Sequence, residues 1–232
     1  LVCALSGCRT SYTTLVQDRE TLTQLAPFIY ILSGNYDGSA TAADFKAAGD
    51  LGIGTFEGLD GEAVMLDGVV YQIKGDGSVL IPDDRTRMPF GACTLFDHDR
   101  RHKIKHIASY ESFGQALEGA FEEPHIFYAV KAEGTFRRIT VRSCDRQTKP
   151  YVPLSEVTRL QHEYTYSDIK GTLVGFWTPR FMPGSVGVPG FHLHFISQDR
   201  AKGGHVLDFT SDHLDTAIDP TPRVTIDFSA PA

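Results

Sequence analysis

The sequence predicts an α+β fold with largely antiparallel sheets. Short runs of strand-forming residues dominate the chain, and turn residues connect most of these runs as hairpins. Only two or three segments have the apolar spacing of a helix, and they do not alternate regularly with the strands. Because a parallel βαβ array needs that alternation, we expect antiparallel sheets with few helices.

The first part of the chain predicts helices followed by a meander. Residues 21–38 contain an apolar, helix-like stretch that Pro27 weakens. A short helix is expected after Thr41, which is a suitable N-cap, and Gly49 is expected to end it. Four strands then follow within residues 51–81, separated by the turn sequences LDG, LDG and GDG.

The second part of the chain predicts mostly hairpins. A strand at 91–96 precedes a helix over 109–121, and residues 125–144 predict a hairpin that turns at Glu133–Gly134. Residues 163–181 predict two further strands, and residues 223–228 predict a last one. A Pro-rich segment places a domain boundary near residue 150. The expected organisation is a leader remnant and tether at 1–20, a domain at 21–150 and a β domain at 151–232.

Composition narrows the possible functions. The 232 residues suffice for one large domain or two small ones. A net charge of −7 and the absence of a Lys/Arg block argue against a nucleic-acid surface. No apolar run approaches the roughly 20 residues that a membrane-spanning helix requires.

The cysteines indicate neither a thiolate metal site nor a redox motif, because none of the four forms a CxxC pair. The chain opens with LVCALSGC, which resembles the end of a bacterial lipoprotein leader with Cys8 as the lipidated residue. We therefore expect a bacterial protein that is either exported as a lipoprotein or secreted, or else cytoplasmic.

Three histidines predict a metal centre. His192 and His194 alternate with apolar residues in FHLHF, so both imidazoles should lie on one face of a strand. A turn within 198–204 leads into a second strand, which places His205 opposite or diagonal to His194. Three imidazoles would leave an open position on a tetrahedral ion, as in catalytic zinc sites. A histidine in a strand is, however, more often an ordinary core or surface residue.

Three further residues could serve such a centre. Glu62 begins an apolar strand after a tight turn, where a carboxylate lies either at a solvated rim or in a cavity. The Thr55 hydroxyl at a strand edge most often satisfies the backbone. Arg142 shares a strand face with Arg138 and Thr140, a pattern more typical of a solvated face.

Other chemistries lack their motifs. The chain has neither a phosphate-binding glycine loop nor a GxSxG serine elbow. A cupin-type metal oxygenase or isomerase shares the HxH strand but normally has a Glu a few residues later, which ISQDRA lacks. A non-catalytic metal-binding domain built on the same histidine hairpin remains an alternative, against which the net charge, Glu62 and Arg142 together argue.

Three blocks of sequence resemble one known family. GDLGIGTFEGLDGEAVMLDG, FYAVKAEGTFRRITVRS and GFWTPRFMPGSVGVPGFHLHFISQDRAKGGHVLDF, in this order, are similar to α-acetolactate decarboxylases. The resemblance implies that His192, His194 and His205 are zinc ligands and that Glu62, Arg142 and Thr55 belong to the active site. It also implies a mixed-sheet domain, an antiparallel barrel-like β domain, a homodimer and the conversion of 2-acetolactate to acetoin and carbon dioxide, a step towards butanediol.

The chain departs from the family pattern at its end. Family members usually carry a late glutamate that reaches the metal pocket, whereas no acidic residue follows Asp227 here. Either the sequence is truncated or this member manages without that carboxylate, so the resemblance leaves the activity, its rate and its stereochemical control open.

The expected chemistry follows from the reaction. Loss of carbon dioxide leaves electrons that flow into the neighbouring ketone, and zinc chelated by the substrate would act as the sink for an enediolate. Arg142 suits a carboxylate or the resulting anion, and Glu62 suits proton transfer. Because the ligand histidines must be neutral, activity should fall in acid as they become protonated.

Overall fold

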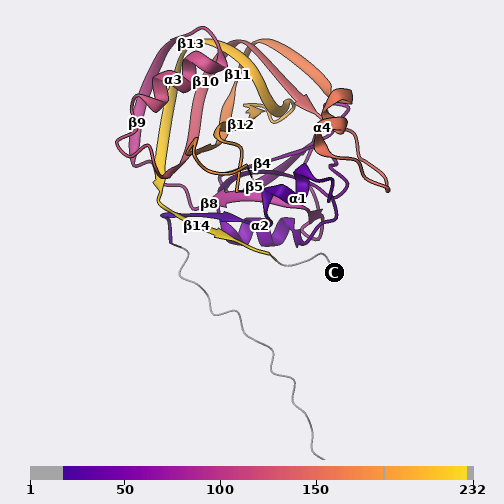
Figure 1. The fold of residues 1–232 in the computed structure, drawn as a ribbon. Coiled ribbons are helices and arrows are strands. Elements are labelled where there is room, and N and C mark those ends of the chain that lie inside the picture. The colour runs from indigo at the N-terminus through magenta and orange to yellow at the C-terminus, as the bar shows by residue number, and fades with distance from the viewer. Residues whose placement is uncertain (1–17, 185, 229–232) are drawn as a thin grey trace, which may run out of the picture.

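The computed structural model describes residues 18–184 and 186–228 (Figure 1). The lipoprotein-like start with Cys8 and most of the expected tether lie outside the described residues. Within them, two sheets pack against each other, and the α+β fold with few helices is confirmed. No helix of this part of the chain is both long and apolar enough to cross a membrane.

The first sheet is mixed. Its order is β14-β1-β8-β3-β4-β5-β6, in which β1 and β14 run parallel and the other neighbours antiparallel. Strands β3 to β6 form the predicted meander. The strands are β1 (Thr21–Gln24), β3 (Leu51–Thr55), β4 (Glu62–Leu66), β5 (Val69–Ile73), β6 (Val79–Leu80), β8 (Phe90–Thr94) and β14 (Arg223–Ile226).

The second sheet is antiparallel and curls into a barrel. Its order is β10-β11-β12-β13-β9, and an additional pairing of β10 with β13 closes the hydrogen-bonded ring. The expected antiparallel, barrel-like sheet is therefore present. Its strands are β9 (Arg100–Ile107), β10 (Phe127–Ser143), β11 (His162–Thr178), β12 (Gly190–Ser197) and β13 (Gly203–Thr221).

The helices are short, and two of them begin as the sequence predicts. Thr41 and Ser109 each cap a helix through a reciprocal capping box, which satisfies free N–H groups of the first turn. The helices are α1 (Phe28–Leu32), α2 (Ala42–Ala48), α3 (Tyr110–Glu118) and α4 (Leu154–Val157), followed by one 3-10 turn (Thr158–Leu160). A small sheet pairs β2 (Ala40–Thr41) with β7 (Arg87–Met88).

The predicted hairpin at Glu133–Gly134 is wrong, because β10 runs straight through it. Gly134 lies opposite Gly171 of β11. A Cβ atom on Gly134 would collide with the Leu214 side chain, and one on Gly171 would collide with the Phe195 ring. These glycines thus serve close packing in the barrel rather than a turn.

Other strand predictions also need correction. Residues 163–181 do not form two strands, because β11 is continuous to Thr178. Strand β9 was not predicted, and β13 extends beyond the predicted hairpin to Thr221. Pairing around a closed barrel stabilises these polar, charged stretches, which lack a clear alternating pattern of their own.

The two sheets are interleaved in the sequence. Strands β9 and β10 precede residue 150 yet belong to the barrel, while β14 near the end of the chain belongs to the mixed sheet. The division between the sheets therefore does not follow a boundary near residue 150, and a division into independently folding domains stays a prediction.

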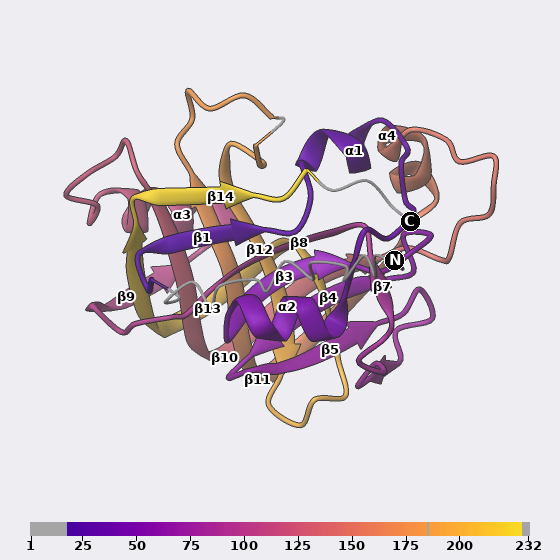
Figure 2. The same cartoon turned by 90° about the horizontal axis from the view of Figure 1, so that it is seen from below.

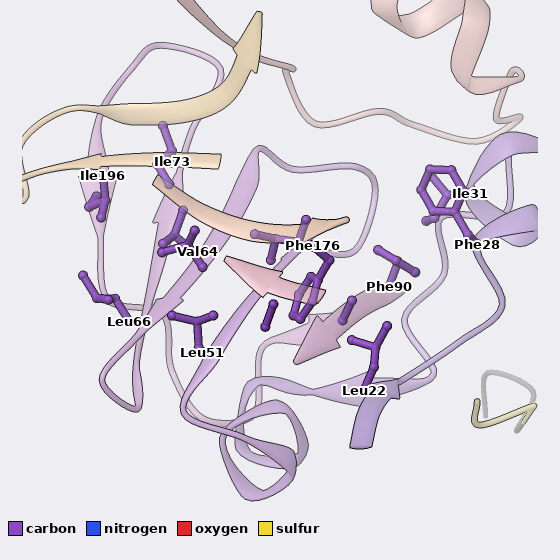
Figure 3. Packing of buried hydrophobic residues seen from close by; sticks show 14 of the residues in the cluster. Leu22, Phe28, Ile31, Leu51, Val64, Leu66, Ile73, Phe90, Phe176 and Ile196 are labelled. Carbon is purple, nitrogen blue, oxygen red and sulfur yellow. The ribbon is translucent and has the colours of Figure 1, made fainter. Parts of the chain in front are cut away.

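A shared core joins the sheets. Leu51 and Val64 of the mixed sheet pack with Phe176 and Ile196 of the barrel (Figure 3). Helix α2 lies over the other face of the mixed sheet (Figure 2), where Phe45 packs in a second cluster with Met65. The layer between the two sheets is thus mainly apolar, so a polar site forms there only where polar side chains enter it.

Candidate metal centre

The histidine hairpin faces the mixed sheet. His192 and His194 lie on one face of β12, and His194 is paired in register with His205 of β13. The imidazole centroids are 5.2, 4.9 and 5.3 Å apart, and one ligand nitrogen from each ring lies within 4.8 Å of the others. The structure therefore brings the three predicted ligands together in an arrangement that could hold a metal ion.

Burial keeps these imidazoles neutral. Desolvation and the nearby Arg142 charge lower the pKa of His192 to about 3. The same causes, with repulsion between the rings, place the pKa values of His194 and His205 well below the ordinary value. Neutral imidazole is the form that donates a lone pair to a metal.

A backbone contact orients the central histidine. Nδ1 of His194 lies 2.9 Å from the carbonyl oxygen of Ala63 in β4. Since a carbonyl can only accept, Nδ1 carries the proton and Nε2 presents its lone pair. That Nε2 is buried and has no hydrogen-bond partner among the described residues. An orphaned buried acceptor beside two other imidazoles fits the role of a metal ligand.

Glu62 enters the site from the mixed sheet. In β4, Ala63 and Met65 face α2, whereas Glu62 and Val64 face the barrel. Its carboxylate oxygens lie 3.5 Å from Nε2 of His194 and 3.7 Å from Nη1 of Arg142. Burial raises the pKa of Glu62 to about 7 although Arg142 opposes the shift. The structure thus favours the cavity over the solvated rim for this residue.

Arg142 and Thr55 complete the predicted set. Arg142 pairs in register with His205, and its side chain is largely buried, while Arg138 on the same strand remains half exposed in an ion pair with Asp208. Thr55 pairs with Glu62 across the β3–β4 hairpin, and its hydroxyl donates to the Gly61 carbonyl at 2.6 Å. The solvated face expected for Arg142 is not found, but the backbone role expected for Thr55 is.

All six residues line one cavity of about 280 Å³. The rest of its wall is mainly apolar, and no sequence pattern predicts the residues that form it. The wall residues come from α1, α4, β3, β8 and three loops, so no spacing in the sequence connects them. They are Phe28, Ile31, Leu32, Gly54, Leu59, Phe90, Cys144, Leu154 and Val188.

The arrangement has two chemically different halves. One half offers three neutral imidazoles, a guanidinium and a carboxyl group whose pKa is near neutrality. The other half is a hydrocarbon wall that excludes water and strengthens charge interactions at the polar end. Such a site can bind a small, oxygen-rich anion with alkyl substituents and can transfer a proton to it.

Relatives of known name match most of the chain. The family model described as alpha-acetolactate decarboxylase matches residues 22–231. An alpha-acetolactate decarboxylase of Brevibacillus brevis is 37% identical over 202 residues, which cover 87% of this chain and 70% of the relative. One of Methanosarcina mazei is 40% identical with the same coverage.

Solved structures agree with these sequence matches. The crystal structure of alpha-acetolactate decarboxylase from Bacillus subtilis strain 168 superposes with a TM-score of 0.87 at 32% identity and covers 91% of this chain and 90% of that one. A Staphylococcus aureus protein described as similar to this enzyme superposes with a TM-score of 0.86, also at 32% identity, covering 90% of this chain and 89% of that one. The chain therefore belongs to the alpha-acetolactate decarboxylase family, which makes it a carboxy-lyase.

Proposed function

We propose that the protein converts 2-acetolactate to acetoin and carbon dioxide with zinc bound by His192, His194 and His205. The observation that carries the proposal is the convergence of these three neutral imidazoles, of which His194 is buried and the other two are partly buried, on a cavity that also contains Glu62 and Arg142. Membership of the decarboxylase family supports the reaction, and the donor set supports the metal.

The donor set fits a divalent ion. Three imidazoles with neighbouring space are typical of catalytic zinc, and iron or manganese can occupy similar sites. A bound ion of this kind supplies a Lewis acid that draws electron density from the substrate's ketone. The wall around the histidines is apolar, so water has little access to compete with substrate oxygens.

Arg142 suits the substrate's carboxylate. Its guanidinium stays charged at every relevant pH and can donate two parallel hydrogen bonds to a carboxylate. The Arg142 side chain is largely buried beside Glu62, and it lines the cavity together with the three histidines. When the bond between C1 and C2 breaks, carbon dioxide leaves, and Arg142 remains near the negative charge that spreads towards the ketone oxygen.

Glu62 suits the proton that acetoin requires. The electron pair left by carbon dioxide must be captured by a proton at C2, because acetoin carries a hydrogen there. A carboxyl group with a pKa of about 7 is partly protonated near neutral pH and can be recharged from solvent. Delivery from one side of the cavity would fix the configuration of acetoin.

Assembly and location are further parts of the proposal. The family resemblance supports a homodimer, which light scattering on the purified protein would measure. The LVCALSGC start supports lipidation at Cys8 and export from a bacterial cell. Metabolic labelling with a fatty acid, in wild type and in a Cys8→Ser variant, would test that part.

Metal analysis combined with an acetoin assay tests the central proposal. Wild type should carry about one zinc per chain and form acetoin, and His194→Ala should lose both. His162→Ala is the matched control, because His162 pairs with Asp145 and does not line the cavity. Metal-replete wild type that forms no acetoin would support the non-catalytic metal-binding alternative instead.

A further inference from the structure

The loop that precedes Glu62 is clamped at almost every residue. It spans residues 56–61 and joins β3 to β4. Glu57 N–H donates to the Arg87 carbonyl at 2.9 Å. Gly58 donates to the Tyr36 carbonyl at 2.9 Å and accepts from Gln147 N–H at 2.6 Å. A connecting loop of this length normally lies on the surface and is mobile, whereas this one is largely buried and held at several points. Its conformation therefore matters.

Leu59 adopts an unusual conformation within this loop. Its φ is +55°, in the left-handed region that a branched aliphatic residue rarely occupies. The side chain is buried, belongs to the core between the sheets and lines the metal cavity. Such strain persists only where the surroundings impose it, and it is concentrated at functional sites.

Asp60, the next residue, is anchored on the opposite face of the mixed sheet. Its carbonyl and side chain are bound by Gln72 of β5, and its side chain is also bound by Lys74, which directly follows that strand. Gln72 Nε2 donates to the Asp60 carbonyl at 2.7 Å and to Oδ2 at 3.2 Å, and Lys74 forms an ion pair with Oδ2. Gln72 pairs with Ala63, whose side chain faces α2 and not the barrel. Asp60 is thus bound on the α2 face of the mixed sheet, whereas the Leu59 side chain lies on the face towards the barrel.

We infer that Leu59 determines which substrates fit the cavity and that Asp60 is a positioning residue which holds it there. The inference rests on the proposed function. Leu59 lies three residues before Glu62 on the same hairpin, so its side chain forms wall beside the carboxyl group that approaches C2 of the substrate. An alkyl group on C2 would meet this wall, and its length would be limited by Leu59.

Chemistry gives the expected size of the effect. An apolar pocket discriminates against one additional methylene by roughly 10- to 200-fold in kcat/KM. Removing the end of the Leu59 side chain should therefore relax the preference for a methyl over an ethyl group at C2. Loosening the Asp60 clamp should relax it less, because Leu59 keeps its volume and loses only its fixed position.

The test compares acetolactate with its homologue carrying ethyl at C2. We expect Leu59→Ala to raise the kcat/KM ratio of the ethyl to the methyl substrate about tenfold, and Asp60→Asn to raise it severalfold. Leu59→Met, which keeps the volume, should retain the wild-type ratio. Two controls should also retain it. Leu51→Ala removes the same atoms from the same core away from the cavity. Lys131→Met removes a largely buried lysine that forms an ion pair with the exposed Asp67.

Binding gives a second measurement that does not need turnover. Substrates whose ketone is reduced to a hydroxyl cannot lose carbon dioxide, so calorimetry with the 2-methyl and 2-ethyl compounds reports fit alone. The affinity ratio should move in the same direction as the kinetic ratio in Leu59→Ala. Wild type that binds both compounds but forms no acetoin would refute the proposed function while leaving this comparison valid.

Two outcomes overturn the inference. One is an unchanged ratio in a folded Leu59→Ala protein, and the other is an equal change in Leu51→Ala. Should Leu59→Ala fail to fold by circular dichroism, Asp60→Asn decides the matter, and an unchanged ratio there refutes the role of the clamp.

Discussion

His194 of the barrel donates its Nδ1 hydrogen to the carbonyl oxygen of Ala63 in the mixed sheet over 2.9 Å. Residue 62, next to this carbonyl, places its carboxylate 3.5 Å from the other nitrogen of the same ring. One strand of the mixed sheet thus fixes the tautomer of a predicted ligand and carries the proposed proton donor. The candidate metal centre therefore depends on the docking of both sheets.

Zinc should stabilise this docking. Saturating zinc should raise the melting temperature and slow amide exchange in residues 62–66 and 190–197, because the ion binds only the arrangement in which the layers are packed. Hydrogen–deuterium exchange with and without zinc measures this. Helix α3, on the far side of the barrel strands, serves as the internal control. Equal protection of α3 and β4 would indicate only general stabilisation.

Glu62→Gln should separate catalysis from metal binding. Loss of a general acid typically lowers kcat by about 10²- to 10⁴-fold, while the three histidines keep their metal. Kinetics and metal content on the same sample measure both effects. Glu57→Gln is the control, since Glu57 pairs with Arg87 outside the cavity. A Glu62→Gln enzyme with wild-type kcat would remove this residue from the mechanism.

Metal retention should extend further into acid than ordinary histidines allow. The pKa of each ligand histidine is lowered by burial, that of His192 to about 3, so protons compete with the metal only at low pH. Because these pKa values are lower in the folded state than in the unfolded one, the free energy of unfolding rises with pH until the unfolded-state histidines lose their protons near pH 6.5. Zinc content after dialysis at pH 5 should equal that at pH 7, and half-loss near pH 6.5 would contradict this. The loss of activity expected in acid should therefore begin below pH 5 if ligand protonation causes it.

Asp219 should make the protein less stable at alkaline pH. Burial is the main cause that raises its pKa to about 8, and neighbouring carboxylates add to it. Since the folded state holds this proton more tightly than the unfolded one, stability falls as pH rises from about 4 to 8. Asp219→Asn keeps an acceptor for Asp97 N–H. The substitution should reduce the pH-dependent loss of unfolding free energy by about 1–3 kcal/mol.

Denaturant unfolding at pH 5 and pH 8 measures the Asp219 effect. Asp212→Asn is the control, because Asp212 is exposed and Arg137 lowers its pKa. The Asp219 account fails if wild type and Asp219→Asn lose the same stability between the two pH values.

The sequence was sufficient to bring the three histidines together because the relevant pattern is local. His192 and His194 share a face through the period of a strand, and a short turn brings His205 opposite. The caps at Thr41 and Ser109 are local in the same way, and the structure shows the first of these as predicted.

Long-range packing decided the rest. Whether Glu62 lies at a rim or in a cavity depends on which face of β4 the barrel covers. The residues near Glu62 in the sequence do not indicate which face this is. The sequence favours a turn at Gly134 because its strand partners, Gly171 of β11 and Leu214 of β13, are distant in the chain. The apolar wall around Leu59 is likewise assembled from separate segments.

X-ray absorption at the zinc edge tests the central claim most directly. Zinc-loaded wild type should show three imidazole nitrogens at about 2.0–2.1 Å with one or more oxygen ligands, and His205→Ala should show fewer imidazoles or no bound zinc. A spectrum of bound zinc without imidazole scattering, or one unchanged by His205→Ala, would contradict the proposed centre.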